Sequence, residues 1–191
     1  GVNVLLGPGL CLKRSPLCGR DFEYFSEDPY LAGKMAAGFV RGIQGQGVAA
    51  CPKHFAVNSQ ETRRQASDSV LDERTLRELY LSAFETVVRE SHPMAIMSSY
   101  NMVNGTYASE NAHLLQEVLR DEWGFGGAVV TDWGASVDHV AGVAAGSTLE
   151  MPDPGLDSVR ELVDAVRGGL IEGSVVDVRV REALALVFHT D

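Results

Sequence analysis

Cysteine is scarce in this sequence, and the few that occur are poorly placed for a disulfide framework. The three cysteines, Cys11, Cys18 and Cys51, are odd in number and show no Cys-x-x-Cys spacing. A small domain held together by disulfides needs more cysteines at regular spacings. Because chains with little cysteine are typical of reducing compartments, we expect a cytoplasmic protein.

The sequence also has fewer basic than acidic residues and lacks long apolar runs. The chain has 16 Lys and Arg residues against 26 Asp and Glu residues, which gives a formal net charge of -10. This balance argues against nucleic acids and anionic membrane surfaces as partners, since both attract basic proteins. No run of about 18 apolar residues occurs, so no membrane-spanning segment is expected.

Sequence motifs for common cofactors are missing as well. No Gly-x-Gly-x-x-Gly or P-loop glycine pattern follows any of the predicted strands, which argues against a doubly wound nucleotide-binding sheet. The five histidines are scattered and show neither His-x-His nor His-Glu-x-x-His spacing. We therefore expect neither a metal ion nor an organic cofactor.

What the sequence does contain is an uninterrupted alternation of short apolar runs and amphipathic segments. Such alternation predicts parallel β-strands joined by crossover helices. Asp28 and Pro29, for example, provide the N-cap and the first residue of a helix. We expect strands near residues 2–6, 48–53, 94–99, 127–131 and 147–151, and helices near residues 29–44, 72–90, 110–123, 136–145, 156–170 and 174–189.

The fold class that fits this alternation best is α/β, with a (β/α)8 TIM-barrel-like architecture. Polar side chains follow every predicted strand at its carboxyl end, where the active sites of such barrels are built. A closed barrel takes about 250 residues, and five strands are too few to close one. We therefore expect residues 1–191 to form one incomplete domain, the later part of a barrel whose first strands are missing.

The stretch from Gly127 to Ala135 has the clearest functional pattern. A buried run ends in Asp132, which is followed by the aromatic Trp133 and the turn residue Gly134. At the carboxyl end of a barrel strand, the carboxylate of Asp132 would project into the region where the chemistry takes place. The simpler alternative is that Asp132 caps the helix that follows.

Polar residues after the other strands could complete such a site. Lys53 and His54 could donate hydrogen bonds to sugar hydroxyls, Lys53 could form a Schiff base, or both could be structural. Arg20 adds a planar fork of donors. Trp133 could offer an apolar face to a sugar ring or simply lie at the edge of the core. Tyr100 could hydrogen-bond a nucleophilic carboxylate or cap its strand.

Several short, different segments follow one another along the chain. They are PLCGR at 16–20 with FEYFSEDP at 22–29, KHF at 53–55 with Asn58 and Gln60-Glu61, MSSYN at 97–101 with VNG at 103–105, TDWGA at 131–135, and EMP at 150–152. Each segment is weak alone. Together, in this order and at about these spacings, they resemble glycoside hydrolase family 3. The first domain of that family is a TIM-like barrel, and this chain resembles its later two-thirds.

The resemblance implies a retaining β-glycosidase that needs no cofactor. Asp132 would be the nucleophile, and Tyr100 would contact it. The residues that would bind the sugar of the terminal subsite are Arg20, Lys53, His54, Tyr100 and Trp133.

A retaining enzyme also needs a second carboxyl group as acid and base, about 5–5.5 Å from the nucleophile. In the β-glucosidase branch of the family this group is a Glu of a second domain that follows the barrel. We therefore expect a further domain of the same polypeptide, beyond Asp191, to complete the site. The family's early aspartate, which grips the sugar, would precede Gly1. Residues 1–191 alone would then be a poor catalyst or none.

The loop at residues 56–61 separates the branches of the family. The N-acetylglucosaminidase branch has a Gly-His-Gly-Asp-type loop that supplies a histidine acid/base, whereas this loop reads Ala-Val-Asn-Ser-Gln-Glu. We therefore expect hydrolysis of terminal non-reducing β-D-glucosyl residues, with β-xylosidase or another exo-β-glycosidase as the alternative. Two other classes stay open: a Schiff-base aldolase built on Lys53, and a non-catalytic carbohydrate-binding barrel remnant.

Overall fold

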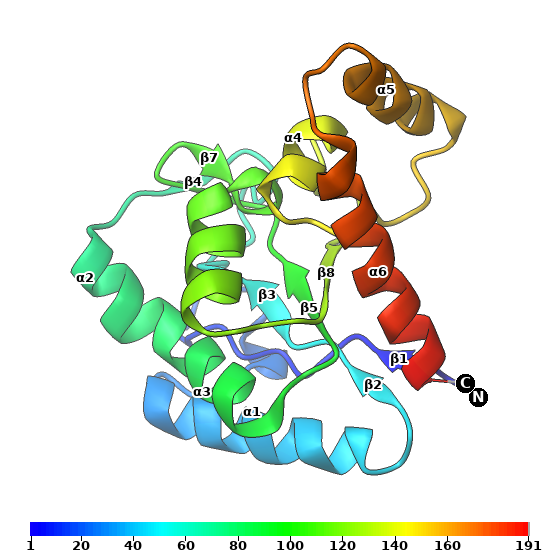
Figure 1. Cartoon of the computed structure of the whole chain (residues 1–191). Coiled ribbons are helices and arrows are strands. Elements are labelled where there is room, and N and C mark those ends of the chain that lie inside the picture. The colour runs from blue at the N-terminus through cyan, green and yellow to red at the C-terminus, as the bar shows by residue number, and fades with distance from the viewer. Residues whose placement is uncertain (191) are drawn as a thin grey trace.

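The short apolar runs form parallel strands that lie side by side in chain order (Figure 1). In the computed structural model, which describes residues 1–190, these strands are β1 (Val4–Leu5), β2 (Ala49–Ala50), β3 (Lys53–Phe55), β5 (Ala95–Ser98) and β8 (Ala128–Thr131). β1 pairs with β2, and β5 lies between β3 and β8. A parallel bridge between Gly9 and Lys53 connects the segment after β1 to β3. A second parallel bridge, between Val130 and Leu149, extends the sheet beyond β8. The predicted α/β class is confirmed.

Helices follow the strands, and their starts carry the expected caps. Asp28 Oδ1 accepts a hydrogen bond from the Tyr30 amide (2.9 Å), and Asp72 Oδ1 accepts one from the Thr75 amide (2.9 Å). The helices are α1 (Pro29–Gln44), α2 (Glu73–Thr75), η2 (Leu76–Leu81), α3 (Ser82–Ser91), η4 (His113–Glu122), α4 (His139–Ala145), α5 (Leu156–Arg167) and α6 (Gly173–His189), with short turns η1 (Asp21–Glu23) and η3 (Ala108–Glu110). Because α2, η2 and α3 are continuous, the helix predicted at 72–90 is confirmed.

The strand predicted at 147–151 is largely absent. This segment contributes only the bridge from Leu149 to Val130. A threonine hydroxyl takes the place of a ladder partner, because the Val129 amide donates to Thr148 Oγ1 (3.0 Å). Side-chain oxygens that bind backbone amides compete with regular strand pairing, and the predicted short strand is reduced to this bridge.

A small second sheet forms where the sequence indicated only a polar loop and a turn. It consists of β4 (Asp68–Ser69), β6 (Met102–Val103) and β7 (Thr106–Tyr107). β6 and β7 form a hairpin around Asn104 and Gly105, both of which have positive φ angles, +51° and +85°. β4 pairs with β6 across a long separation in the sequence, which local patterns do not reveal.

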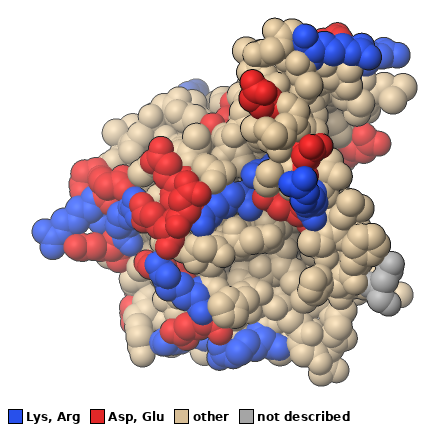
Figure 2. All heavy atoms as spheres, viewed as in Figure 1, with Lys and Arg blue, Asp and Glu red and all other residues tan. Residues whose placement is uncertain are grey.

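Charged side chains gather on the outer helices with opposite signs next to one another. Figure 2 shows such a mixed cluster over α2 and its neighbours. Arg77 joins it across two segments, since its guanidinium pairs with Glu73 (2.5 Å) and with Glu122 of η4. Within residues 1–190 no helix has both the length and the apolar character needed to cross a membrane.

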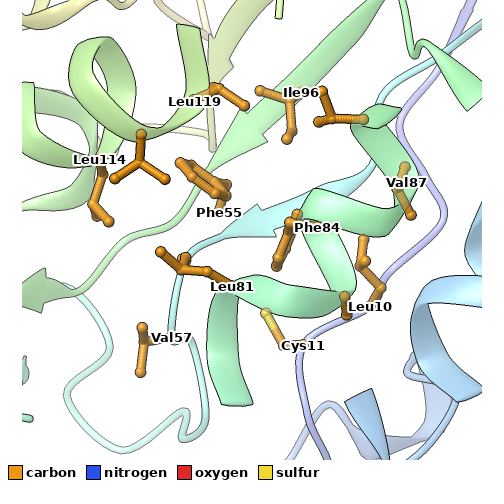
Figure 3. Packing of buried hydrophobic residues seen from close by; sticks show 14 of the residues in the cluster. Leu10, Cys11, Phe55, Val57, Leu81, Phe84, Val87, Ile96, Leu114 and Leu119 are labelled. Atoms are coloured by element: carbon orange, nitrogen blue, oxygen red, sulfur yellow. The ribbon is translucent and has the colours of Figure 1, made fainter. Parts of the chain in front are cut away.

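The main core lies between the strands and the helices α1, α3 and η4. Phe55 is fully buried there, with its ring 5.2 Å from that of Phe84 and 5.9 Å from that of Trp123, in edge-to-face geometry (Figure 3). Phe55 follows His54 directly, and the pairing of β3 with β5 shifts register between Lys53 and Phe55, so the strand is irregular where it carries His54.

The opposite face of the sheet is covered by α6. Leu186 packs there against small and medium side chains of the strands, which are Ala49, Cys51, Ala95, Met97, Ala128 and Val130. The end of α6 lies near β1 (Figure 1), and Asn3 Nδ2 donates a hydrogen bond to the Thr190 carbonyl (2.6 Å). Both faces of the sheet are therefore buried, and polar groups gather at its carboxyl end.

Candidate active site

Asp132 lies directly after β8, at the carboxyl end of a strand, as predicted. Its Oδ1 accepts a hydrogen bond from the backbone N–H of Trp133 (2.8 Å), and Gly134, with a φ of +76°, turns the chain away. The next helix, α4, begins at His139 rather than near 136, and Asp138 is its N-cap. The alternative interpretation of Asp132 as a helix cap is therefore wrong.

The second carboxylate oxygen of Asp132 faces two nitrogen donors from earlier segments. Arg20 Nη1 is 3.7 Å and His54 Nε2 is 3.4 Å from Oδ2. His54 is fully buried and Asp132 is 8% exposed. Within the described residues, neither His54 Nε2 nor Asp132 Oδ2 has a hydrogen-bond partner. Because buried polar atoms are seldom left unpaired, these two atoms are well placed to bind a polar ligand.

The imidazole of His54 is neutral. Burial, together with the positive charges of Arg20 and Lys53, lowers the pKa of His54 to about 2. The ring therefore carries a single N–H at physiological pH. Its Nδ1 lies 3.0 Å from the hydroxyl of Tyr24, and the thiol of Cys11 donates to the His54 carbonyl (3.1 Å).

Glu23 joins the two cations of the site. Its Oε1 accepts a hydrogen bond from Arg20 Nε (2.5 Å), and its Oε2 lies 3.2 Å from Lys53 Nζ. Although burial alone would raise the pKa of Glu23, the hydrogen bond from Arg20 and the charge of Lys53 lower it overall. Glu23 is thus an ionised clamp that sets the direction of both cationic side chains.

Tyr100 and Trp133 lie on the other side of Asp132. The Tyr100 hydroxyl donates to the Trp133 carbonyl (3.0 Å), so its hydrogen bond goes to the backbone next to the carboxylate. Burial and the charge of Asp132 raise the pKa of Tyr100. The guanidinium of Arg64 lies over the Tyr100 ring, 4.3 Å from its centre. Trp133 itself is 43% exposed, so much of its side chain is accessible.

The predicted site residues therefore converge, while three neighbours were missed. Arg20, His54 and Asp132 approach one another directly, and Lys53 joins them through Glu23. The missed residues are Glu23, Tyr24 and Arg64. A carboxylate three positions after Arg20 is a signal that could have identified Glu23. Tyr24 has no such signal, because its partner lies 30 positions later.

Two further polar residues at strand ends contact neighbouring segments rather than Asp132. Glu150 Oε2 lies 2.5 Å from Nδ1 of His139, and Asn101 Nδ2 donates to the carbonyl of Ala56 (3.2 Å). In residues 1–190, no group of three or more His, Cys, Asp or Glu side chains is arranged to hold a metal ion.

Comparison with known proteins identifies the group to which this arrangement belongs. Residues 1–182 match the Glycosyl hydrolase family 3 N terminal domain. The chain belongs to glycosyl hydrolase family 3. The resemblance inferred from the sequence motifs is thereby confirmed.

Two family 3 relatives show how much of a longer protein is present. Thermostable beta-glucosidase B of Acetivibrio thermocellus is 50% identical over 98% of this chain and 25% of its own length. An exo-alpha-(1->6)-L-arabinopyranosidase of Bifidobacterium longum is 50% identical over 99% of this chain and 25% of its own length. The chain therefore spans about a quarter of the length of these relatives.

Solved family 3 structures share the fold. Beta-glucosidase 3B from Thermotoga neapolitana, in complex with glucose, superimposes with a TM-score of 0.96 at 46% identity, over 99% of this chain and 27% of that one. This chain is accordingly part of the TIM-barrel-like N-terminal domain of the family, as the strand–helix alternation predicted.

Proposed function

We propose that this family 3 chain carries the nucleophile and the sugar-binding donors of a retaining β-glycosidase that removes terminal non-reducing β-D-glucosyl residues. The observation that carries the proposal is a difference in hydrogen bonding between the two carboxylate oxygens of Asp132. Oδ1 is held by the Trp133 amide (2.8 Å), while Oδ2 has no hydrogen-bond partner in residues 1–190. A nucleophilic carboxylate needs this combination of one fixed and one free oxygen.

The reaction follows from that free oxygen. Asp132 Oδ2 forms a bond to the anomeric carbon while the bond from that carbon to the aglycone oxygen breaks, and the departing oxygen takes a proton from a general acid. Water, deprotonated by the same group, then attacks the anomeric carbon and releases the carboxylate, so the configuration is retained. The Arg20 guanidinium, 3.7 Å from Oδ2, stabilises the charge of the free carboxylate.

The surrounding donors suit a polyhydroxylated ligand. Arg20, Lys53 and His54 supply N–H donors, and Glu23 orients the first two. The exposed part of the Trp133 indole suits the C–H side of a sugar ring. Tyr100 fixes the backbone that carries Trp133 by its hydrogen bond to that residue's carbonyl.

The general acid is proposed to come from a part of the polypeptide outside these 191 residues. Glu23, the other carboxylate of the cluster, is unsuited to the task. Arg20 and Lys53 lower the pKa of Glu23, whereas a glycosidase acid needs a raised pKa. The relatives are about four times as long as this chain, which leaves room for such a contribution.

A Schiff-base aldolase built on Lys53 fits the geometry less well. An amine that attacks a carbonyl must be neutral and free. Lys53 Nζ instead lies 3.2 Å from the carboxylate of Glu23. Membership of a family named for glycosyl hydrolysis also favours the glycosidase.

The test is the release of dinitrophenol from 2,4-dinitrophenyl β-D-glucoside. This leaving group departs without protonation, so the chain does not need its general acid for the first step. We expect release above background from the wild-type chain and a fall of roughly 10³-fold or more in Asp132→Asn. The matched control is Asp153→Asn, because Asp153 is an exposed turn residue.

The result also separates the remaining alternatives. An equal rate in Asp132→Asn would remove Asp132 as the nucleophile. No release from a chain that unfolds cooperatively, but is stabilised by a glucose-like iminosugar, would indicate a carbohydrate-binding remnant. Because one relative is named an arabinopyranosidase, the dinitrophenyl β-xyloside and α-L-arabinopyranoside belong in the same panel.

A further inference from the structure

Tyr24 and His54 form a buried pair to which the proposed reaction assigns no step. Tyr24 is 4% exposed and His54 is fully buried. The Tyr24 hydroxyl lies 3.0 Å from His54 Nδ1, and the other ring nitrogen, Nε2, lies 3.4 Å from Asp132 Oδ2. The two neighbours differ in kind, because a phenol both donates and accepts, whereas a carboxylate only accepts.

A neutral imidazole carries one N–H, so two tautomers must be compared. With the hydrogen on Nδ1, the Nε2 lone pair would face the carboxylate oxygen of Asp132, acceptor against acceptor. The Tyr24 hydroxyl would then need another acceptor inside the core. The Cys11 thiol lies beside it, but sulfur accepts weakly and this thiol already donates to the His54 carbonyl (3.1 Å).

With the hydrogen on Nε2, both contacts pair a donor with an acceptor. Tyr24 donates to Nδ1, and the Nε2–H points toward Asp132 Oδ2. Burial raises the pKa of Tyr24, so the phenol keeps the hydrogen that it donates. The contact of 3.4 Å to Asp132 is long for a hydrogen bond, so the N–H stays available to a ligand hydroxyl.

The phenol is also held firmly in place. It lies in the main core, and the backbone at Gly9 passes close to its ring. A Cβ added to Gly9 would lie 3.0 Å from Cδ1 of Tyr24 and 2.9 Å from the Glu23 carbonyl oxygen. The loop that carries Tyr24 therefore packs closely on the backbone at Gly9.

We propose that Tyr24 is a positioning residue for His54. Its hydroxyl donates to Nδ1 and holds the ring in the Nε2–H tautomer, which directs an N–H at the oxygen of Asp132 and at a sugar hydroxyl bound beside it. The tautomer follows from the contacts within the fold alone. Only its consequence for sugar binding rests on the proposed function.

Nitrogen-15 NMR of the histidine-labelled chain tests the tautomer, because protonated and unprotonated ring nitrogens have well-separated chemical shifts. The chain has five histidines, so the resonances that disappear in His54→Gln identify the ring. We expect the hydrogen on Nε2 in the wild-type chain. A hydrogen on Nδ1 would overturn the proposal, and this measurement requires no variant of Tyr24.

A comparison of variants separates the effect of Tyr24 from that of the carboxylate. In Asp132→Ala we expect the Nε2–H tautomer to persist, because Tyr24 still donates to Nδ1. Adding Tyr24→Phe should raise the Nδ1–H population about tenfold, as one buried hydrogen bond is lost. No change on adding Tyr24→Phe would contradict the proposal. Tyr107→Phe is the control, since its hydroxyl donates to the Gln65 carbonyl and loses a hydrogen bond away from His54.

A binding measurement tests the consequence for the sugar. We expect Tyr24→Phe to raise the Kd of a glucose-configured iminosugar about tenfold by calorimetry. The control Tyr107→Phe loses only a hydrogen bond to the Gln65 carbonyl and should leave the Kd unchanged. Equal binding by Tyr24→Phe and the wild-type chain would overturn the positioning role. Absence of binding by the wild-type chain would instead count against the proposed function, and the NMR result would still decide the tautomer.

Discussion

Lys53 Nζ lies 3.2 Å from Oε2 of Glu23, a contact that joins the first residue of β3 to the loop between β1 and α1. The other oxygen of the same carboxylate accepts from Arg20 (2.5 Å). One half-buried anion thus orients two cations, and the guanidinium of one of them, Arg20, also lies 3.7 Å from Asp132 Oδ2.

We expect Glu23→Gln to weaken binding of a glucose-configured iminosugar by about tenfold. The amide is neutral, so the pairing with Lys53 is lost and the Arg20 fork is held by one weaker bond. Calorimetric Kd values for both proteins provide the measurement. Glu78→Gln is the control, because Glu78 pairs with Arg74 (3.0 Å) on the exposed surface. Equal Kd values for Glu23→Gln and the control would rule out the clamp.

Glu182→Gln should destabilise the fold strongly. The Glu182 carboxylate pairs with Arg120 (2.9 Å) and Arg179 (3.2 Å), and all three side chains are at most 10% exposed. Burial lowers the pKa of Arg120 to about 10, while the charge of Glu182 acts in the opposite direction. The Glu182 carboxylate is thus the counter-charge that the buried guanidinium needs. Leaving two buried cations uncompensated costs about 3–5 kcal/mol in the free energy of unfolding.

Urea unfolding of Glu182→Gln, with coincident fluorescence and circular dichroism transitions, measures that loss. Asp157→Asn is the matched control, because Asp157 is exposed and its pair with Arg160 (3.2 Å) is solvated. We expect the control to change the free energy of unfolding by less than about 0.5 kcal/mol. A loss below about 1 kcal/mol in Glu182→Gln would show that the cluster is not a buried charge network.

The pairing of His113 should stabilise the fold only at lower pH. Hydrogen bonding to Glu117, and also to Glu73, raises the pKa of His113. A raised folded-state pKa gives stability that is fully present below the unfolded value, about 6.5, and is lost as the pH rises through the folded-state value. The side chain is 39% exposed, so the effect stays below about 1 kcal/mol.

Melting temperatures of the wild-type chain and His113→Gln between pH 5.5 and pH 9 measure this dependence. The difference in favour of the wild-type chain should shrink as the pH rises. His189→Gln is the parallel variant, because its ring contacts the carbonyl of Ala185. A His113→Gln difference that grows with pH would have the wrong sign for this ion pair.

Local chemistry was sufficient to predict the elements and the central carboxylate. Asp28 before Pro29 predicted the start of α1 because an N-cap acts within one turn. Asp132 after a buried run predicted a polar group at a strand end because parallel strands share that edge. These predictions depend on residues adjacent in sequence, which is why they hold.

The details that failed depend on contacts between distant segments. The strand at 147–151 is cut short because Thr148 offers its hydroxyl to the Val129 amide. Glu23 and Tyr24 become part of the site only because the loop that carries them packs against Lys53 and His54. The spacing from Arg20 could have indicated Glu23, but no periodicity or spacing encodes the contacts of this loop with Lys53 and His54.

The role of Asp132 is tested most directly by trapping the covalent intermediate. The chain is incubated with 2,4-dinitrophenyl 2-deoxy-2-fluoro-β-D-glucoside, whose fluorine slows release of the sugar, and is then examined by intact mass and peptide mapping. We predict one added fluoroglucosyl group on the peptide that contains Asp132, and none in Asp132→Asn. A label on another peptide, or no label on a chain that unfolds cooperatively, would contradict the assignment of Asp132 as the nucleophile.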